Sequence, residues 1–187
     1  GLVEKILPLF NCNQKLALSA IRAAGNIAAS IDEHTQYLLD HSIYQYIAPL
    51  LSCTNQKIRK EVYWLLSNIA AGTRAQMLTL FSLNIFHQII RDLEQGEYSV
   101  QREACWIISN VLHSSTIEEA QPFIESKVLF FMKKFLISKD TPMIIVVVEV
   151  LLILLRVIYF TQFSYIQVII SSNIFVKKLK NQECWIV

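Results

Sequence analysis

Apolar positions in this chain recur at helical spacing through most of its length. In 56–71, for example, Val62, Leu65, Leu66 and Ile69 are three or four residues apart, as on one face of an α-helix. The same pattern predicts helices at Asp32–Asp40, Ile43–Leu51, Gln56–Ala71, Ala75–Leu80, Ile85–Leu93, Ser99–His113, Ile117–Ile124, Val128–Ile137 and Met143–Tyr159. They follow one another as a short helix, a second helix and a longer third helix, which indicates repeated units.

A polar and a large side chain recur together at a strict spacing of 42 residues. The pairs are Arg22 with Asn26, Trp64 with Asn68, and Trp106 with Asn110. This period is typical of armadillo and HEAT solenoids, in which stacked helical units bury one another's apolar faces. We therefore predict an all-α, right-handed superhelical solenoid of armadillo repeats. Its expected divisions are a partial repeat at 1–30, repeats at about 31–72, 73–114 and 115–159, and a partial repeat at 160–187.

Composition supports a helical protein and excludes several functions. Apolar residues make up 53% and charged residues 17%, against about 45–50% and about 25% in typical domains. The net charge of +2 is too small to indicate a nucleic-acid partner. The cysteines Cys12, Cys53, Cys105 and Cys184 form no CxxC pair, so we interpret them as reduced core residues of an intracellular protein, with disulfides or a metal site as the alternative. No cofactor is expected. No known catalytic motif is present, and we do not expect an enzyme.

Two helix starts have their own signals. Ser30, followed three residues later by Glu33, matches a capping box and predicts the N-cap of the helix at 32–40. Asp140 or Thr141 is expected to cap the helix that begins at Pro142, where a missing N–H is tolerated.

The stretch Met143–Phe160 is apolar at all but two positions and long enough to cross a membrane. Glu149 opposes insertion, because an acidic residue near the bilayer centre costs about 2.5–3.5 kcal/mol. The positions 42 residues after the Trp106/Asn110 pair, Val148 and Leu152, also fall inside this stretch. We expect a buried solenoid helix, and a membrane span is the alternative.

Each third helix carries a polar stripe beside its apolar face. Glu61, Trp64 and Asn68, with Ser67 close by, lie along one side of the helix, and Glu103, Trp106, Ser109 and Asn110 repeat the arrangement. A carboxamide can bind both the N–H and the C=O of a peptide unit. Two indoles can hold the stem of Lys or Arg, whose cation favours a ring face and a carboxylate. The stripe predicts an extended basic peptide as ligand; the alternative is core tryptophans with a structural asparagine ladder.

The segments EVYWLLSNIAAGTRAQ and REACWIISNVL closely resemble the armadillo repeats of importin-α, the adaptor that carries nuclear-localisation signals. IRAAGNIAASIDEHTQYLLD resembles the family repeat in which Arg replaces Trp, and KDTPMIIVVVEVLLILL resembles the ninth repeat. The resemblance covers about Ile6 to Leu155. It implies a nuclear import adaptor that moves between cytoplasm and nucleus, with this stretch forming the smaller, C-terminal site for basic signals.

The resemblance also implies residue roles and partners. Trp64 and Trp106 would form the slots, Asn26, Asn68 and Asn110 would hold the peptide backbone, Glu61 and Glu103 would meet basic side chains, Arg22 would organise acidic neighbours, and Thr35 falls where the family often has a peptide contact. Implied partners are basic cargo proteins, importin-β through an N-terminal arm outside these residues, and an export receptor at the C-terminal repeats. Nucleic acid and membrane are not expected partners. An armadillo scaffold for other peptides, or a protein anchored through 143–160, stays open as an alternative.

Overall fold

The computed structural model describes the backbone of residues 1–182 and the side chains of residues 1–163. In this part the chain forms α-helices and short 3-10 helices (η). They are α1 (Leu2–Ile6), η1 (Leu7–Asn11), α2 (Gln14–Ala28), α3 (Asp32–Asp40), α4 (Ile43–Ile47), η2 (Ala48–Ser52), α5 (Gln56–Ala70), α6 (Arg74–Ser82), α7 (Phe86–Gln95), α8 (Tyr98–Ser114), α9 (Ile117–Glu125), α10 (Val128–Met132), η3 (Lys133–Ile137) and α11 (Thr141–Gln182).

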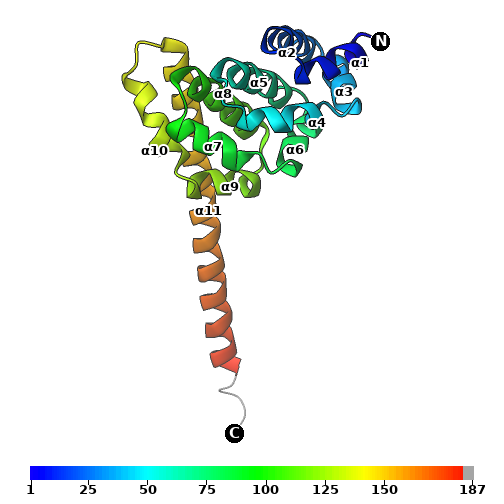
Figure 1. Ribbon diagram of the computed structural model, residues 1–187. Coiled ribbons are helices and arrows are strands. Elements are labelled where there is room, and N and C mark those ends of the chain that lie inside the picture. Colours follow the sequence, from blue (N-terminus) through cyan, green and yellow to red (C-terminus); the bar gives the residue numbers. More distant parts are fainter. Residues whose placement is uncertain (183–187) are drawn as a thin grey trace.

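The long third helices stack in chain order. α5 packs between α2 and α8, and α8 packs in turn against α11. A pair of shorter helices precedes each of them: α3 and α4 before α5, α6 and α7 before α8, and α9 and α10 before α11 (Figure 1). The predicted all-α solenoid is therefore confirmed.

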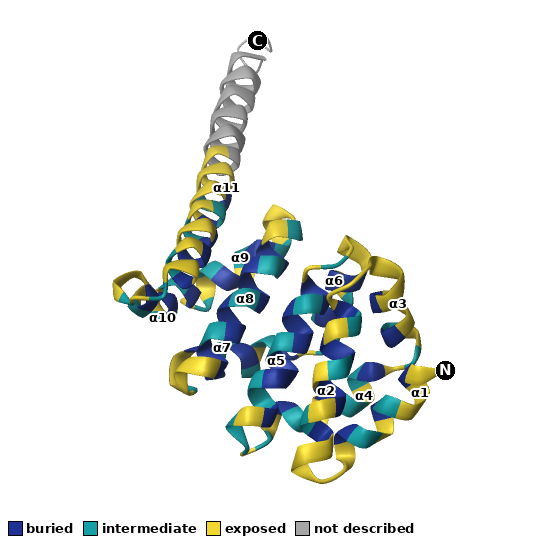
Figure 2. Ribbon diagram, turned by 90° about the horizontal axis from the view of Figure 1, so that it is seen from above, coloured by how far each residue is buried: buried dark blue, intermediate teal, exposed yellow. Residues whose placement is uncertain are grey.

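The core follows the apolar pattern of the sequence. Val62, Leu65, Leu66 and Ile69 are all 0% exposed, and the buried positions concentrate where the third helices meet (Figure 2). Each such side chain contributes roughly 1.5–3 kcal/mol through burial. A unit alone could not bury these residues, because both sides of α5 are covered by neighbouring units.

Side chains cap several helix starts, but one predicted cap is wrong. Capping boxes begin α6 and α9, made by Thr73 with Gln76 and by Thr116 with Glu119. The predicted box of Ser30 and Glu33 does not form. The N-cap of α3 is Ile31, because the Ser30 hydroxyl donates instead to the Ile27 carbonyl at 2.7 Å, at the end of α2.

The register of α11 is shifted by one residue from the expected phase. α8 begins 42 residues after α5, but α11 begins 43 residues after α8. Its cap is Asp140, whose Oδ1 accepts the Met143 N–H at 3.4 Å, as Asn55 caps α5. The buried residues shift with it: Met143, Val146, Val147, Val150 and Leu154 follow Val100, Glu103, Ala104, Ile107 and Val111 at the new spacing. Glu149 and Ile153 therefore occupy the places of Trp106 and Asn110, and the expected equivalence with Val148 and Leu152 is wrong.

The length of α11 also differs from the prediction. We expected this helix to end at Tyr159 and a further partial repeat to occupy 160–187. Instead α11 continues unbroken to Gln182 and extends well beyond the body of the molecule (Figure 1). No glycine or proline follows Pro142 to stop it. The remainder of the expected repeat, 183–187, lies outside the described residues.

The first half of α11 is part of the solenoid on one face only. Thr141–Phe163 is long and apolar enough to cross a membrane, yet 33% of the residues in its most apolar stretch are buried in the protein. The buried side chains form one stripe: Met143, Val146, Val147, Val150, Leu154 and Val157. This stripe packs on α8, α9 and η3. The expected solenoid helix is thus present, but it is buried on one face only, and its opposite face is exposed.

Candidate peptide-binding groove

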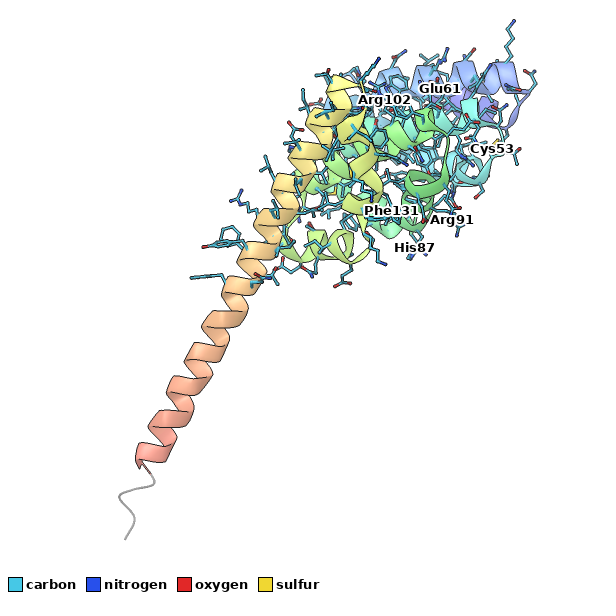
Figure 3. All side chains as sticks on the ribbon, turned by 90° about the vertical axis from the view of Figure 1, so that its left-hand side faces the viewer. Cys53, Glu61, His87, Arg91, Arg102 and Phe131 are labelled. Carbon is cyan, nitrogen blue, oxygen red and sulfur yellow. The ribbon has the colours of Figure 1, made fainter. Side chains whose placement is uncertain are left out.

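A groove of ≈ 550 Å³ lies between α5 and α8. Its lining comes from equivalent positions of the two helices: Lys60, Trp64, Ser67, Asn68 and Ala71 from α5, and Arg102, Glu103, Trp106 and Asn110 from α8. Figure 3 shows Glu61 and Arg102 along one side of the body, while His87 and Arg91 lie on the opposite side. The structure therefore brings the predicted tryptophans and two of the asparagines to one surface.

Trp64 is held in place by a glycine of the preceding unit. Both Trp64 and Trp106 are half-buried at the groove. A Cβ added to Gly25 of α2 would overlap Cζ3 of the Trp64 indole, so the ring packs directly on the helix backbone there. The indole can approach this closely only because Gly25 has no side chain. Trp64 is therefore partly core and partly groove wall.

The asparagines link each third helix to the one before it. The Asn68 Nδ2 donates to the Gly25 carbonyl at 3.1 Å, and the Asn110 Nδ2 donates to the Ser67 carbonyl at 2.9 Å. Each carboxamide has a second N–H and an oxygen, and no other hydrogen bond of these two groups is found within residues 1–163. The structural ladder and the binding site are thus compatible, because each half-buried carboxamide keeps a donor and an acceptor.

Glu61 is already engaged inside the protein. Its Oε1 lies 2.8 Å from Arg22 Nη2 of α2 and 3.4 Å from Lys60 Nζ. Burial raises the pKa of Glu61, but the hydrogen bond from Arg22 and the charges of Lys60 and Arg22 outweigh it, so the pKa is lowered. Arg22 thus organises an acidic neighbour across two units. A ligand cation would reach the Glu61 carboxylate only by sharing it with these two side chains.

Glu103 has the opposite electrostatic situation. Glu103 is 5% exposed, and no hydrogen bond to its carboxylate is found in the described part of the chain. Burial raises the pKa of Glu103, and the charges of Lys60 and Arg102 only partly offset this. The ionised form of Glu103 is therefore unfavourable in the folded protein, although this carboxylate lines the groove.

Glu103→Gln is expected to increase the free energy of unfolding at pH 7. A raised pKa in the folded state means that the ionised carboxylate opposes folding, and this cost disappears as the pH falls through the raised pKa. The gain should therefore shrink toward pH 4. Urea denaturation at both pH values measures it, with the exposed Glu33→Gln as control. A Glu103→Gln variant less stable than the wild type at pH 7 would contradict this interpretation.

Three predicted site residues lie elsewhere or are otherwise engaged. Thr35 is 1% exposed, and its hydroxyl donates to the Ala28 carbonyl at 2.9 Å, so the expected peptide contact is wrong. Ser67 lines the groove, but its hydroxyl donates to the Trp64 carbonyl at 2.8 Å. Asn26 is exposed on α2, outside the lining of this groove.

Two lining cations were missed in the sequence. Lys60 and Arg102 stand four residues before Trp64 and Trp106 and repeat at the same spacing of 42, which was a visible signal. Lys60 also lines a neighbouring hollow of ≈ 480 Å³ that includes Arg22 and Glu61. The groove surface therefore continues from α8 across α5 to α2.

No protein-family model and no curated protein match this sequence. Solved structures do match. A designed armadillo repeat protein is 21% identical with a TM-score of 0.76, over 82% of this chain and 65% of that chain. Another, in complex with the peptide (KR)4, is 25% identical with a TM-score of 0.71, over 79% of this chain and 62% of that chain. A computationally designed armadillo repeat protein for modular peptide recognition is 23% identical with a TM-score of 0.70, over 79% of this chain and 62% of that chain.

The chain thus spans less than two thirds of the length of each of these designed proteins. In this chain the three-helix units stack through their third helices. Structural similarity at 21–25% sequence identity establishes the fold alone. The described chain has the armadillo-repeat fold.

Proposed function

We propose that the α5/α8 groove binds an extended basic peptide of the nuclear-localisation-signal class, and that the protein acts as a nuclear import adaptor between cytoplasm and nucleus. One observation carries the proposal: two half-buried indoles and two carboxamides line a single groove at equivalent positions of successive helices. The indoles suit the aliphatic stem of Lys or Arg. The carboxamides suit the peptide backbone in any sequence.

The charges of the groove support a cationic ligand. Arg102 Nε lies 2.9 Å from Asp140 Oδ2, and Lys60 is paired with Glu61. Glu103 is the charged lining residue for which no ion pair is found within residues 1–163. A Lys or Arg side chain of the ligand would supply that missing partner. A charge-assisted hydrogen bond of this kind is stronger than a neutral one.

The structural likeness agrees with this ligand class. One of the similar designed armadillo proteins forms a complex with the peptide (KR)4. The resemblance to importin-α adds the cellular role and the basic cargo proteins as partners. An armadillo scaffold that binds acidic or apolar peptides would use the same surface with different chemistry.

A titration distinguishes these possibilities. A labelled Lys/Arg-rich peptide is expected to bind in fluorescence polarisation, and a peptide of equal length with Glu at those positions is not. The affinity should fall at high salt, because groove charges are screened over about 8–10 Å at physiological ionic strength. Binding of the acidic peptide without the basic one would overturn the proposal.

A further inference from the structure

The face of α11 that points away from the solenoid is apolar and exposed. Ile145, Val148, Leu152, Leu155 and Tyr159 are between 40% and 63% exposed. We call these five residues the α11 seam. They alternate at intervals of three and four residues, which is the spacing of the a and d positions of a coiled coil. Figure 2 shows this exposed surface along α11 next to the buried face that joins the body.

Internal comparison shows what kind of element covers such a face. The α8 residues at the same repeat positions as Val148, Leu152 and Leu155 are Cys105, Ser109 and Leu112. All three are at most 2% exposed, because the third helix of the next unit packs on α8. The α11 seam is therefore a helix-packing surface by its position in the repeat. Its side chains are larger and more apolar than their counterparts at two of the three positions.

Two charges flank the seam on one edge. Glu149 follows Val148, and Arg156 follows Leu155, so both occupy the e position of the heptad and are exposed. If two copies of α11 pack antiparallel about the midpoint between Leu152 and Ile153, the e positions of the two helices face each other. Glu149 of each copy then lies opposite Arg156 of the other. A parallel pair would place these charges opposite the apolar Ile144 and Leu151, the g residues five positions earlier.

We propose that the α11 seam is a homodimer interface, in which two copies of this chain pack antiparallel along Ile145–Tyr159. Two symmetric Glu149–Arg156 pairs would fix direction and register, as e and g charges do in coiled coils. The solenoid body is attached through the buried stripe of α11, on the face opposite the seam. This inference is independent of peptide binding, since the seam and the α5/α8 groove share no residue.

Insertion into a bilayer is the competing explanation of this apolar surface. It would carry Glu149 and Arg156 into hydrocarbon, where charged side chains are unfavourable. It would also require the buried face of α11, including Val150 and Leu154, to separate from the body. Dimerisation covers the seam without either cost.

The first test is the oligomeric state of the full chain by sedimentation velocity over a concentration series. The wild type is expected to be a dimer and Leu152→Asp a monomer with unchanged helical circular dichroism. Ile137→Asp, at a residue that is 90% exposed outside the seam, should remain a dimer. A monomeric wild type at every concentration overturns the proposal, whether or not the protein floats with phosphatidylcholine vesicles.

Charge exchange tests the antiparallel direction. Glu149→Arg or Arg156→Glu alone places like charges at both symmetric pairs, and each should weaken dimerisation roughly tenfold or more, as expected for two exposed pairs that become repulsive. The double variant Glu149→Arg/Arg156→Glu restores both pairs on the same chain and should recover the wild-type dissociation constant. Equal weakening in the double variant would overturn the antiparallel arrangement.

Discussion

Asp92→Ala is expected to lower the free energy of unfolding by about 3–5 kcal/mol, the usual cost of removing one partner from a buried charged pair. Asp92 of α7 is 5% exposed. Its Oδ2 accepts the Tyr63 hydroxyl at 2.6 Å, and its Oδ1 lies 3.6 Å from Arg59 Nη2. Tyr63 is itself 0% exposed, and burial is the main reason that its pKa is strongly raised. The alanine variant would leave the buried Tyr63 hydroxyl and the partly buried Arg59 guanidinium without this acceptor.

Urea denaturation at pH 7 measures the loss. Asp92→Asn keeps an oxygen for the Tyr63 hydroxyl but removes the charge near Arg59, so it should cost less than the alanine variant. Asp40→Ala provides the control, because Asp40 is exposed and accepts only from exposed Gln36 in the described structure. Its effect should stay within about 0.5 kcal/mol. If the losses at Asp92 and Asp40 are equally small, the Tyr63–Asp92 bond does not hold α5 to α7.

Trp64→Ala should weaken binding of a Lys/Arg-rich peptide by about 1–3 kcal/mol, through loss of the cation–ring interaction and of apolar burial. Trp106→Ala should have a similar effect, since its indole lines the same groove. Gly25→Ala should also weaken binding although it touches no ligand. The new methyl group would lie within 3.0 Å of three atoms of the Trp64 ring and would displace it.

A double variant separates ring displacement from other effects of the Gly25 change. In the Trp64→Ala background no ring is present to displace, so Gly25→Ala should cause no further loss of peptide affinity. There it should even stabilise the protein by up to about 1 kcal/mol, because alanine favours a helix interior over glycine. Peptide affinity is measured by fluorescence polarisation, and stability by urea denaturation, for the wild type, the two single variants Gly25→Ala and Trp64→Ala, and the double variant. Unchanged peptide affinity in both Trp64→Ala and Trp106→Ala would show that the indoles do not contribute to peptide binding.

Much of the groove was predictable from sequence because its residues recur locally. Trp64 and Asn68 are four residues apart on one helix, so helical geometry alone places them on one side. Their recurrence in α8 at a spacing of 42 predicts a shared surface once the units stack. The hydrogen bonds made by the Thr35 and Ser30 hydroxyls were not predictable in this way. Both hydroxyls are bonded to carbonyls in the last turn of α2. The bond from Thr35 depends on how α3 packs beside that turn, and the local bond from Ser30 competes with the predicted cap.

The sequence alone determined the helical units, their order and the polar stripe on each third helix, because apolar periodicity and fixed spacing act within one unit and its copies. The tertiary structure decided the rest. It paired Glu61 of α5 with Arg22 of α2, a contact that joins two helices, while leaving Glu103 without an ion pair in the described chain. It also set the one-residue shift of α11, since a cap and a buried stripe fix register only when the helix packs on its neighbour.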